Sequence, residues 1–311
     1  KDHSKKIEKM IGSEKLFKIT GLTQEPIFAI NKMLWLKEKE PEIYEKSSKW
    51  VIIANYIAWK LSGEQVTDYS LACRTLAFDL QKLKWSKEII EELDLKKSFF
   101  PEVRPTGSKL NYVKDDASRQ TGLSTDCIVG VGGHDHPLSA LITGAIKYGV
   151  MSNSIGTAEC LLTGIEKPSF DLRLIDLGFA EHVIVSSDRQ YYYLFGSIWT
   201  TSASIDWIKN IVAGKESFSE IINKVKAIPS GANGVNFFPH LRFGSPPNPV
   251  QNSRGAFTGL STDTDSSTLL RAVLEGVSLD TKHVFETMIK QLNTSYEEIL
   301  TTGGATQNKL L

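Results

Sequence analysis

Three glycine-bearing turns hold the residues of this sequence that are best suited to chemistry. Each follows a run with the composition of a strand, and they read Gly132-Gly133-His134-Asp135-His136, Ser154-Ile155-Gly156-Thr157-Ala158-Glu159 and Thr302-Gly303-Gly304-Ala305-Thr306-Gln307-Asn308. Glycine lets the backbone approach a ligand closely, and backbone N–H groups in such turns can hold phosphate oxygens. None of the turns is a Walker A loop or a GxGxxG motif. One such turn is weak evidence, but three at strand ends favour a nucleotide site.

Asp135 is the side chain in these turns that could accept a proton. A carboxylate held at the end of a strand can take the proton of an alcohol that attacks phosphorus. The alternative is that Asp135 caps a helix beginning near Pro137, and the local sequence alone favours this cap. The flanking His134 and His136 could ligate a metal ion, but the spacing supplies no third ligand, so we expect no metal site here.

The secondary structure expected to position these turns differs between the first and second parts of the chain. Residues 1–125 have the periodicity of amphipathic helices, whereas residues 126–311 alternate strands and helices, which predicts two domains with these bounds. Expected helices span residues 26–39, 49–61, 137–144, 197–212 and 267–293, with Ser62-Gly63 ending the second and Ser86 capping another. Expected strands span residues 127–131, which we predict to be buried, 150–155, 160–163, 180–187, 190–195 and 299–302.

Composition excludes several classes of protein. The 311 residues carry 36 basic and 36 acidic side chains, and without a basic stripe we expect no nucleic-acid partner. No apolar run approaches the roughly 18 residues of a membrane span, and the first residues lack the apolar core of a signal peptide. Cys73, Cys127 and Cys160 are widely spaced, so we expect small buried residues in a reducing compartment, by default the cytoplasm.

Both ends of the sequence are typical of a fragment. The chain opens in a charged segment without an obvious first strand. A helix that starts at Thr306 would complete little more than one turn before Leu311. We therefore expect these residues to be part of a longer protein.

Further segments complete a collinear series with the three turns. They are residues 27–36, Thr67-Asp68-Tyr69-Ser70, Pro101-Glu102-Val103-Arg104, Phe195-Gly196-Ser197 through Trp207, and Gly255-Ala256-Phe257-Thr258-Gly259-Leu260 through Glu275. This series resembles the FGGY carbohydrate kinases, which include glycerol, xylulose, ribulose and gluconate kinases. The first and last segments are similar to the two family signatures, and the three turns are similar to the catalytic, phosphate and adenosine turns. The resemblance covers nearly the whole chain, and the series is far more specific than any one member.

The resemblance implies an α/β fold of the actin-like ATPase type, with two domains of RNase H-like topology, present here in part. It implies ATP as the phosphate donor with Mg²⁺, and a sugar or polyol as the acceptor. The implied residue roles are the general base for Asp135, ATP phosphate contacts for Gly156 and Thr157, nucleotide contacts for Ser202, Gly303, Gly304 and Asn308, and substrate contacts for His136 and Ile27. A homodimer is compatible with this assignment.

The sequence also departs from the family pattern. The family's Asp-x-Gly-Thr phosphate hairpin is not in this chain, and residues 239–244 replace a more usual Gly-Glu-Arg loop. Ile27 stands where glycerol kinases carry a Tyr that contacts the substrate, which weakens a glycerol assignment. We expect little or no kinase activity from these 311 residues alone.

The predicted reaction is transfer of the ATP γ-phosphoryl group to a sugar or polyol hydroxyl. A ketopentose such as xylulose is preferred, with glycerol and gluconate as alternatives. Two hypotheses of other classes stay open: a non-catalytic sugar- or nucleotide-binding protein on the same fold, and an actin-like or chaperone-type ATPase with a protein partner. The latter proteins share the fold but lack the two signature segments, and function cannot be inferred from fold alone.

Overall fold

The computed structural model describes residues 2–212 and 218–307, and these form two compact units. The first unit contains residues 2–142, 165–175 and 180–194. The second contains residues 143–164, 176–179 and the described residues from 195 onwards. The domain boundary expected between residues 125 and 126 stays a prediction.

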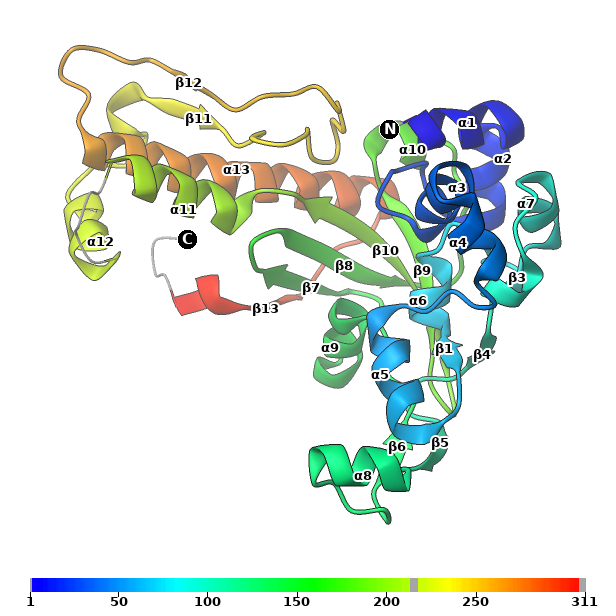
Figure 1. The fold of residues 1–311 in the computed structure, drawn as a ribbon. Coiled ribbons are helices and arrows are strands. Elements are labelled where there is room, and N and C mark those ends of the chain that lie inside the picture. The colour runs from blue at the N-terminus through cyan, green and yellow to red at the C-terminus, as the bar shows by residue number, and fades with distance from the viewer. Residues whose placement is uncertain (1, 213–217, 308–311) are drawn as a thin grey trace. The chain divides into compact units, whose positions relative to one another are not determined.

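The first unit is built mainly from short helices (Figure 1). Its helices are α1 (Asp2–Ile11), α2 (Ser13–Thr20), α3 (Ala29–Lys39), α4 (Pro41–Lys46), α5 (Ile53–Ser62), α6 (Tyr69–Cys73), α7 (Lys87–Glu92), α8 (Asp115–Thr121), most of α9 (Asp135–Thr143), the start of α10 (Arg173–Leu177) and the 3₁₀ turn η1 (Lys97–Phe99). Its strands are β1 (Val66–Asp68), β2 (Phe78–Asp79), β3 (Lys84–Trp85), β4 (Glu102–Arg104), β5 (Lys109–Tyr112), β6 (Ile128–Gly130), β9 (Ala180–Val185) and the first part of β10 (Gln190–Ile198).

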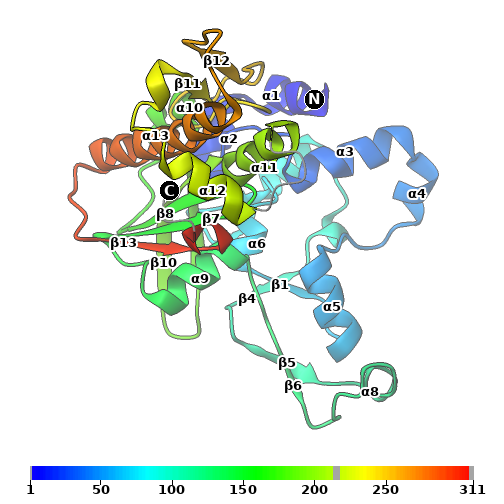
Figure 2. The ribbon, with the colours of Figure 1, turned by 90° about the vertical axis from the view of Figure 1, so that its left-hand side faces the viewer.

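Separate apolar clusters organise this unit. Helices α1, α2, α3 and α7 bury one face each in a common core that includes Leu16, Ile30 and Ile89. The antiparallel pair β5–β6 packs with α5 and α8 over a smaller core, which contains Leu110 and Val129 (Figure 2). Strand β1 pairs in parallel with β4, and this pairing places Asp68 beside Arg104.

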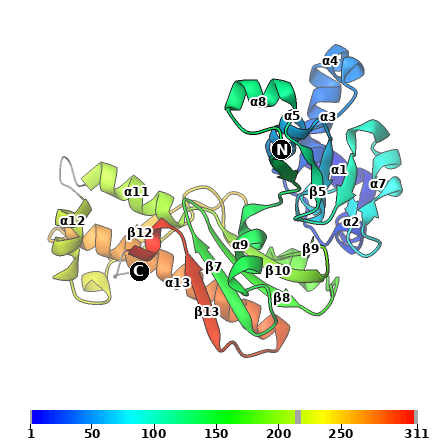
Figure 3. The ribbon, with the colours of Figure 1, turned by 90° about the horizontal axis from the view of Figure 1, so that it is seen from below.

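The second unit is layered around its longest helix. It contains β7 (Val150–Ile155), β8 (Glu159–Ile165), the end of β10, α11 (Thr201–Val212), α12 (Phe218–Lys226), η2 (Ala232–Gly234), β11 (Asn236–Phe238), β12 (Ala256–Thr258), α13 (Ser266–Leu292), β13 (Glu298–Thr302) and η3 (Gly304–Gln307). Strands follow the order β13-β7-β8-β10, with β13 parallel and β8 antiparallel to β7. Helices α11 and α13 lie side by side over this sheet, and the β11–β12 pair lies on the other side of α13 (Figures 1 and 3).

Local signals in the sequence explain where several elements begin and end. The hydroxyl of Ser86 accepts the amide of Ile89 and caps α7, as predicted. Gly63 takes the left-handed conformation that ends α5, also as predicted. The carboxylate of Asp265 caps α13, whose bounds agree with the predicted helix to within one residue.

Other element predictions were wrong in their bounds. The helix expected from residue 26 begins at Ala29, after a turn, and the helix expected from residue 49 begins at Ile53, because Ile52 is extended. Strand β10 continues to Ile198, so the helix expected from residue 197 starts at Thr201. Residues 1–125 also contain the short strands β1 to β5, which the sequence did not predict.

The expected burial of two features was also wrong. Among the described residues, strand β6 pairs only with β5, so its side chains alternate: Val129 is buried and Ile128 is 57% exposed. Cys73 and Cys160 are buried as expected, but Cys127 is exposed. Among the described residues, no helix has both the length and the apolar character needed to cross a membrane.

Candidate functional site

Asp135 is the first residue of α9, directly after the glycine turn that follows β6. Its side chain is 85% exposed, and its Oδ1 accepts the amide of the adjacent His136 at 2.9 Å. An N-cap carboxylate instead takes an N–H two or three residues on, so this bond does not have the geometry of the capping alternative. The Nε2 atom of His134 lies 3.5 Å from the same oxygen.

Electrostatics keep Asp135 ionised. Desolvation raises the pKa of its carboxyl, but the neighbouring His136 and His134 and backbone N–H groups outweigh it, so the pKa lies below the usual aspartate value. The pKa of His134 is lowered to about 3, first by burial and then by the positive charge of Arg74. At neutral pH the turn therefore presents a carboxylate beside a neutral imidazole.

A buried carboxylate behind the turn fixes its backbone. Ser70 accepts the amide of His134 at 2.8 Å and donates to Oδ2 of Asp68 at 2.5 Å. The same Asp68, which is fully buried, also accepts from the hydroxyl of Thr106 at 3.2 Å. A Cβ atom on Gly133 would lie 2.9 Å from Oδ2 of Asp68, so glycine is needed for this close approach. We name Asp68, Ser70 and Thr106 the turn bracket.

Arg74 connects this turn with the loop that carries Ile27. Its guanidinium lies 5.8 Å above the ring of Phe28, and its charge acts on both Glu25 and His134. Ile27 itself is 45% exposed in the turn before α3. The Ile27 loop and the Asp135 turn therefore both lie near the guanidinium of Arg74. Sequence reasoning did not single out Arg74, although its place four residues after the family-like segment of residues 67–70 was a signal.

The three residues of the turn also form a cluster of candidate metal ligands. One ligand atom each from His134, Asp135 and His136 lies within 4.8 Å of the others, and within residues 2–212 and 218–307 no other such group occurs. The positive charge of Arg74 acts on this cluster and disfavours a cation there. The expectation that no metal ion binds at this turn stays a prediction.

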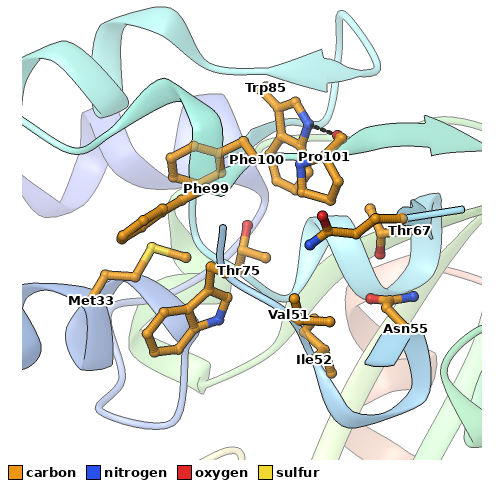
Figure 4. A pocket seen from close by; sticks show the side chains of 12 residues that line it. Met33, Val51, Ile52, Asn55, Thr67, Thr75, Trp85, Phe99, Phe100 and Pro101 are labelled. Carbon is orange, nitrogen blue, oxygen red and sulfur yellow. Dashed lines mark hydrogen bonds between the residues drawn. The ribbon is translucent and has the colours of Figure 1, made fainter. Parts of the chain in front are cut away.

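A small cavity in the first unit is too small for a sugar. It measures about 20 Å³, and its walls include Trp85, Phe99 and Asn55 (Figure 4). Within the described residues, the buried oxygens Gln65 Oε1 and Thr67 Oγ1, both from lining residues, have no hydrogen-bond partner. A space of this size accommodates about one water molecule, which could satisfy such atoms.

In the second unit, strand register brings two glycine turns together. Strand β13 pairs in parallel with β7, so Thr302 lies beside Ser154 and both strands end at the same edge. Gly303 has φ of 102°, and a Cβ atom on it would lie 2.2 Å from the carbonyl oxygen of Ile155. No larger residue fits there without displacing the Gly156 turn. At Gly304, by contrast, a Cβ atom would meet nothing within 4 Å among the described residues.

The N-terminus of α11 joins the same edge. The amide of Ala203 donates to the carbonyl of Thr157 at 3.3 Å, which places Ser202 next to the Gly156 turn. The carboxylate of the buried Glu159 accepts a hydrogen bond from the hydroxyl of Thr201 at 2.8 Å, and this bond anchors the start of α11. Sequence reasoning gave Glu159 no role.

This arrangement suits an anionic ligand. Backbone N–H groups at a helix N-terminus and in glycine turns favour phosphate groups. The predicted residues Gly156, Thr157, Ser202, Gly303 and Gly304 all lie at this edge of the sheet. Asn308 lies outside the described residues.

Two family models match the chain, one to each part. Residues 2–142 match the N-terminal domain of the FGGY family of carbohydrate kinases, and residues 151–311 match its C-terminal domain.

The chain belongs to the FGGY family of carbohydrate kinases.

Relatives and solved structures agree with this membership. The chain is 27% identical over 281 residues to a xylulose kinase of Bacillus subtilis, covering 90% of this chain and 55% of the relative. It is 28% identical over 302 residues to glycerol kinase 2 of Saccharolobus solfataricus, covering 94% and 58%. The structure superposes on a ligand-bound xylulose kinase of Lactobacillus acidophilus with a TM-score of 0.85 at 24% identity, covering 99% of this chain and 61% of that one.

The chain thus spans a little over half the length of these curated relatives. The structural likeness confirms the predicted fold class, an actin-like α/β ATPase fold present in part.

Proposed function

We propose that the protein to which this chain belongs phosphorylates a hydroxyl of a sugar or polyol with ATP. The observation that carries the proposal is the Asp135 turn, where an exposed carboxylate with a lowered pKa is held by a bracket whose Asp68 and Ser70 are fully buried. A carboxylate that stays ionised at neutral pH can accept a proton in every turnover. Family membership supplies the reaction class.

In the proposed reaction, the substrate hydroxyl attacks the γ-phosphorus of ATP. The new bond joins the hydroxyl oxygen to phosphorus, the bond from phosphorus to the bridging oxygen breaks, and ADP leaves. The hydroxyl proton moves to an Oδ atom of Asp135. We assign His136 to orienting the substrate beside this carboxylate, and Ile27 to contacting the substrate.

The second unit is assigned to the nucleotide. Gly156 and Thr157 would hold phosphate oxygens, while Ser202, Gly303, Gly304 and Asn308 would contact the rest of ATP. Their fit to a nucleotide rests on the close approach of Gly303 to Ile155 and on the open surface at Gly304. Mg²⁺ bound to the nucleotide would neutralise the charge that develops on the phosphate oxygens.

A ketopentose such as xylulose is the proposed acceptor. Xylulose kinases are among the relatives in sequence and in structure, and glycerol and gluconate kinases also occur there. Ile27 cannot make the hydrogen bond that a Tyr hydroxyl would make, which favours a sugar over glycerol.

The test is ADP release by the full-length protein with a panel of xylulose, ribulose, glycerol and gluconate. We expect release to depend on one of these compounds, with xylulose giving the highest kcat/KM. Binding of xylulose and ATP without sugar-dependent ADP release would identify a non-catalytic binding protein. A higher kcat/KM for glycerol or gluconate would refute the substrate while leaving the reaction class intact.

A further inference from the structure

A second cavity lies in the second unit, between α13 and the segment that joins β11 to β12. It measures about 350 Å³, which is within the range of small-molecule sites. Figure 1 shows β11 and the chain that leaves it above α13. Its walls include residues 239–240, from the loop that departs from the family pattern, and none of its lining residues belongs to the glycine turns.

The walls of this cavity are mostly apolar. Phe237, Phe238 and Leu279 line it together with Pro239, Pro246 and Pro247. Phe238 is 48% exposed and Leu279 is 63% exposed, so part of the apolar wall is open to solvent. An apolar body of limited size would bury this surface.

Two buried polar atoms from different elements belong to lining residues of this cavity. They are Nδ1 of His240, on the loop, and Oδ2 of Asp280, on α13. Neither atom has a hydrogen-bond partner among residues 2–212 and 218–307. A buried polar atom that stays unsatisfied is destabilising, so a pair of them in residues that line one cavity is a feature that a ligand could satisfy.

Glu275 and Asp280 are the carboxylates that line this cavity, and Asp280 is the one available to a ligand. Glu275, the other lining carboxylate, pairs with the guanidinium of Arg271 at 2.6 Å and accepts the amide of Gly231. Burial raises the pKa of Asp280, while His240, a hydrogen bond from Ser245 and His283 act against this rise. A positive charge near Oδ2 would relieve the cost of burying the carboxylate.

A metal ion is the first cation to consider, because two imidazoles accompany the carboxylate. However, His240, Asp280 and His283 do not form one of the compact ligand groups in the described part of the chain. An organic cation tolerates a wider spacing of acceptors, and its apolar part would fill the space along the phenylalanine and proline side chains.

We propose that this cavity binds a small primary amine with an apolar body. The ammonium group donates hydrogen bonds to Oδ2 of Asp280 and to Nδ1 of His240, in the tautomer that carries its proton on Nε2. The apolar body packs against Phe237, Phe238 and Leu279. The site is separate from the residues assigned to ATP, so it adds an amine ligand that the kinase reaction does not require.

The experiment compares two ligands of the same shape on the 311-residue chain. Benzylamine and benzyl alcohol are titrated separately and followed by the amide chemical shifts of residues 235–248 and 275–283. We expect benzylamine to bind about tenfold or more tightly, since a hydrogen bond to a charged group is stronger than a neutral one. Equal affinities would overturn the proposal, and this comparison needs no substitution that could impair folding.

Two variants locate the amine. Asp280→Asn should weaken benzylamine binding about tenfold or more and leave benzyl alcohol unchanged. Glu286→Gln is the matched control, because Glu286 is an exposed carboxylate on the same helix, and it should bind both ligands as the unsubstituted chain does. Unchanged benzylamine binding in Asp280→Asn would refute the site. If zinc displaces benzylamine from the unsubstituted chain but not from His283→Gln, the cavity is a metal site and the amine proposal is wrong.

Discussion

The Asp135 turn and the glycine turns of the second unit are fixed in two different ways. Side chains hold the Asp135 turn: Ser70 and Asp68 form a buried chain of hydrogen bonds to the amide of His134. Backbone packing holds the glycine turns, because Gly303 lies directly against the carbonyl of Ile155. The first region should therefore be sensitive to loss of a polar group, and the second to the addition of a single carbon atom.

The largest effect on stability is expected at Gly303. Gly303→Ala places a Cβ atom 2.2 Å from the carbonyl of Ile155 in a backbone conformation with φ of 102°. Strain and overpacking together should lower the free energy of unfolding by about 2–4 kcal/mol. Chemical denaturation of the chain measures this loss.

The neighbouring glycine supplies the control. Gly304→Ala meets open space, so it should change stability by no more than about 0.5 kcal/mol. Equal losses in the two variants would show that the close approach at Gly303 does not fix the turn.

The next largest effect is expected in the turn bracket. Ser70→Ala removes the acceptor of the His134 amide and a donor to the buried Asp68, which should cost about 1–3 kcal/mol. Because Ser70 holds the Asp135 turn, to which no nucleotide contact is assigned, kcat of the full-length protein should fall while its Kd for ATP stays unchanged. Steady-state kinetics and nucleotide titration measure the two quantities.

Ser187→Ala is a matched control for this variant. Ser187 is exposed in the same unit, and its loss should leave stability and kcat within experimental error. If Ser70→Ala weakened ATP binding as strongly as it lowered kcat, the bracket would not be specific to the Asp135 turn.

The smallest effect is expected for Glu159→Gln, at the buried carboxylate of the second unit. Burial raises the pKa of this carboxyl despite its hydrogen bonds, so the folded state takes up a proton at higher pH than the unfolded state does. Stability from this group is present at low pH and is lost as pH rises through the folded-state pKa. Glu159→Gln should therefore be neutral or slightly stabilising at pH 7, and its difference from the unsubstituted chain should shrink as pH falls toward 4.5.

Glu159→Ala separates the charge from the hydrogen bonds. It leaves the hydroxyls of Thr201 and Thr281 without their acceptor and should destabilise the chain by about 1–3 kcal/mol. Denaturation curves at several pH values measure both variants. A Glu159→Gln variant as unstable as Glu159→Ala would mean that the ionised carboxylate, rather than the acceptor oxygen, anchors α11.

Features that depend on neighbouring residues could be predicted from the sequence, whereas features that depend on distant residues could not. Turns, caps and the long helix α13 depend on neighbouring residues, so Ser86, Gly63 and Asp265 mark real helix ends. The glycine turns were visible for the same reason. Their meeting depends on the pairing of β13 with β7, which joins residues about 150 positions apart and has no local signature.

The contacts that hold the Asp135 turn could not be predicted from the sequence, because they join residues that are far apart in the chain. Asp68 and Ser70 contact the turn across more than 60 residues, and Arg74 acts on His134 through space. Ile128 was expected to be buried because an apolar run does not reveal how many strands will pair beside it. Polar support and sheet position both depend on tertiary structure.

The central claim is that Asp135 is the base, and it is tested most directly by Asp135→Asn in the full-length protein. General-base catalysis contributes about 10²–10⁴-fold, so sugar-dependent ADP release should fall by about that factor or more. Because the nucleotide contacts are assigned to the second unit, the Kd for ATP should stay unchanged. Asp126→Asn, which alters an exposed aspartate in the same segment, should retain full activity. Turnover by Asp135→Asn close to that of the unsubstituted protein would contradict the account.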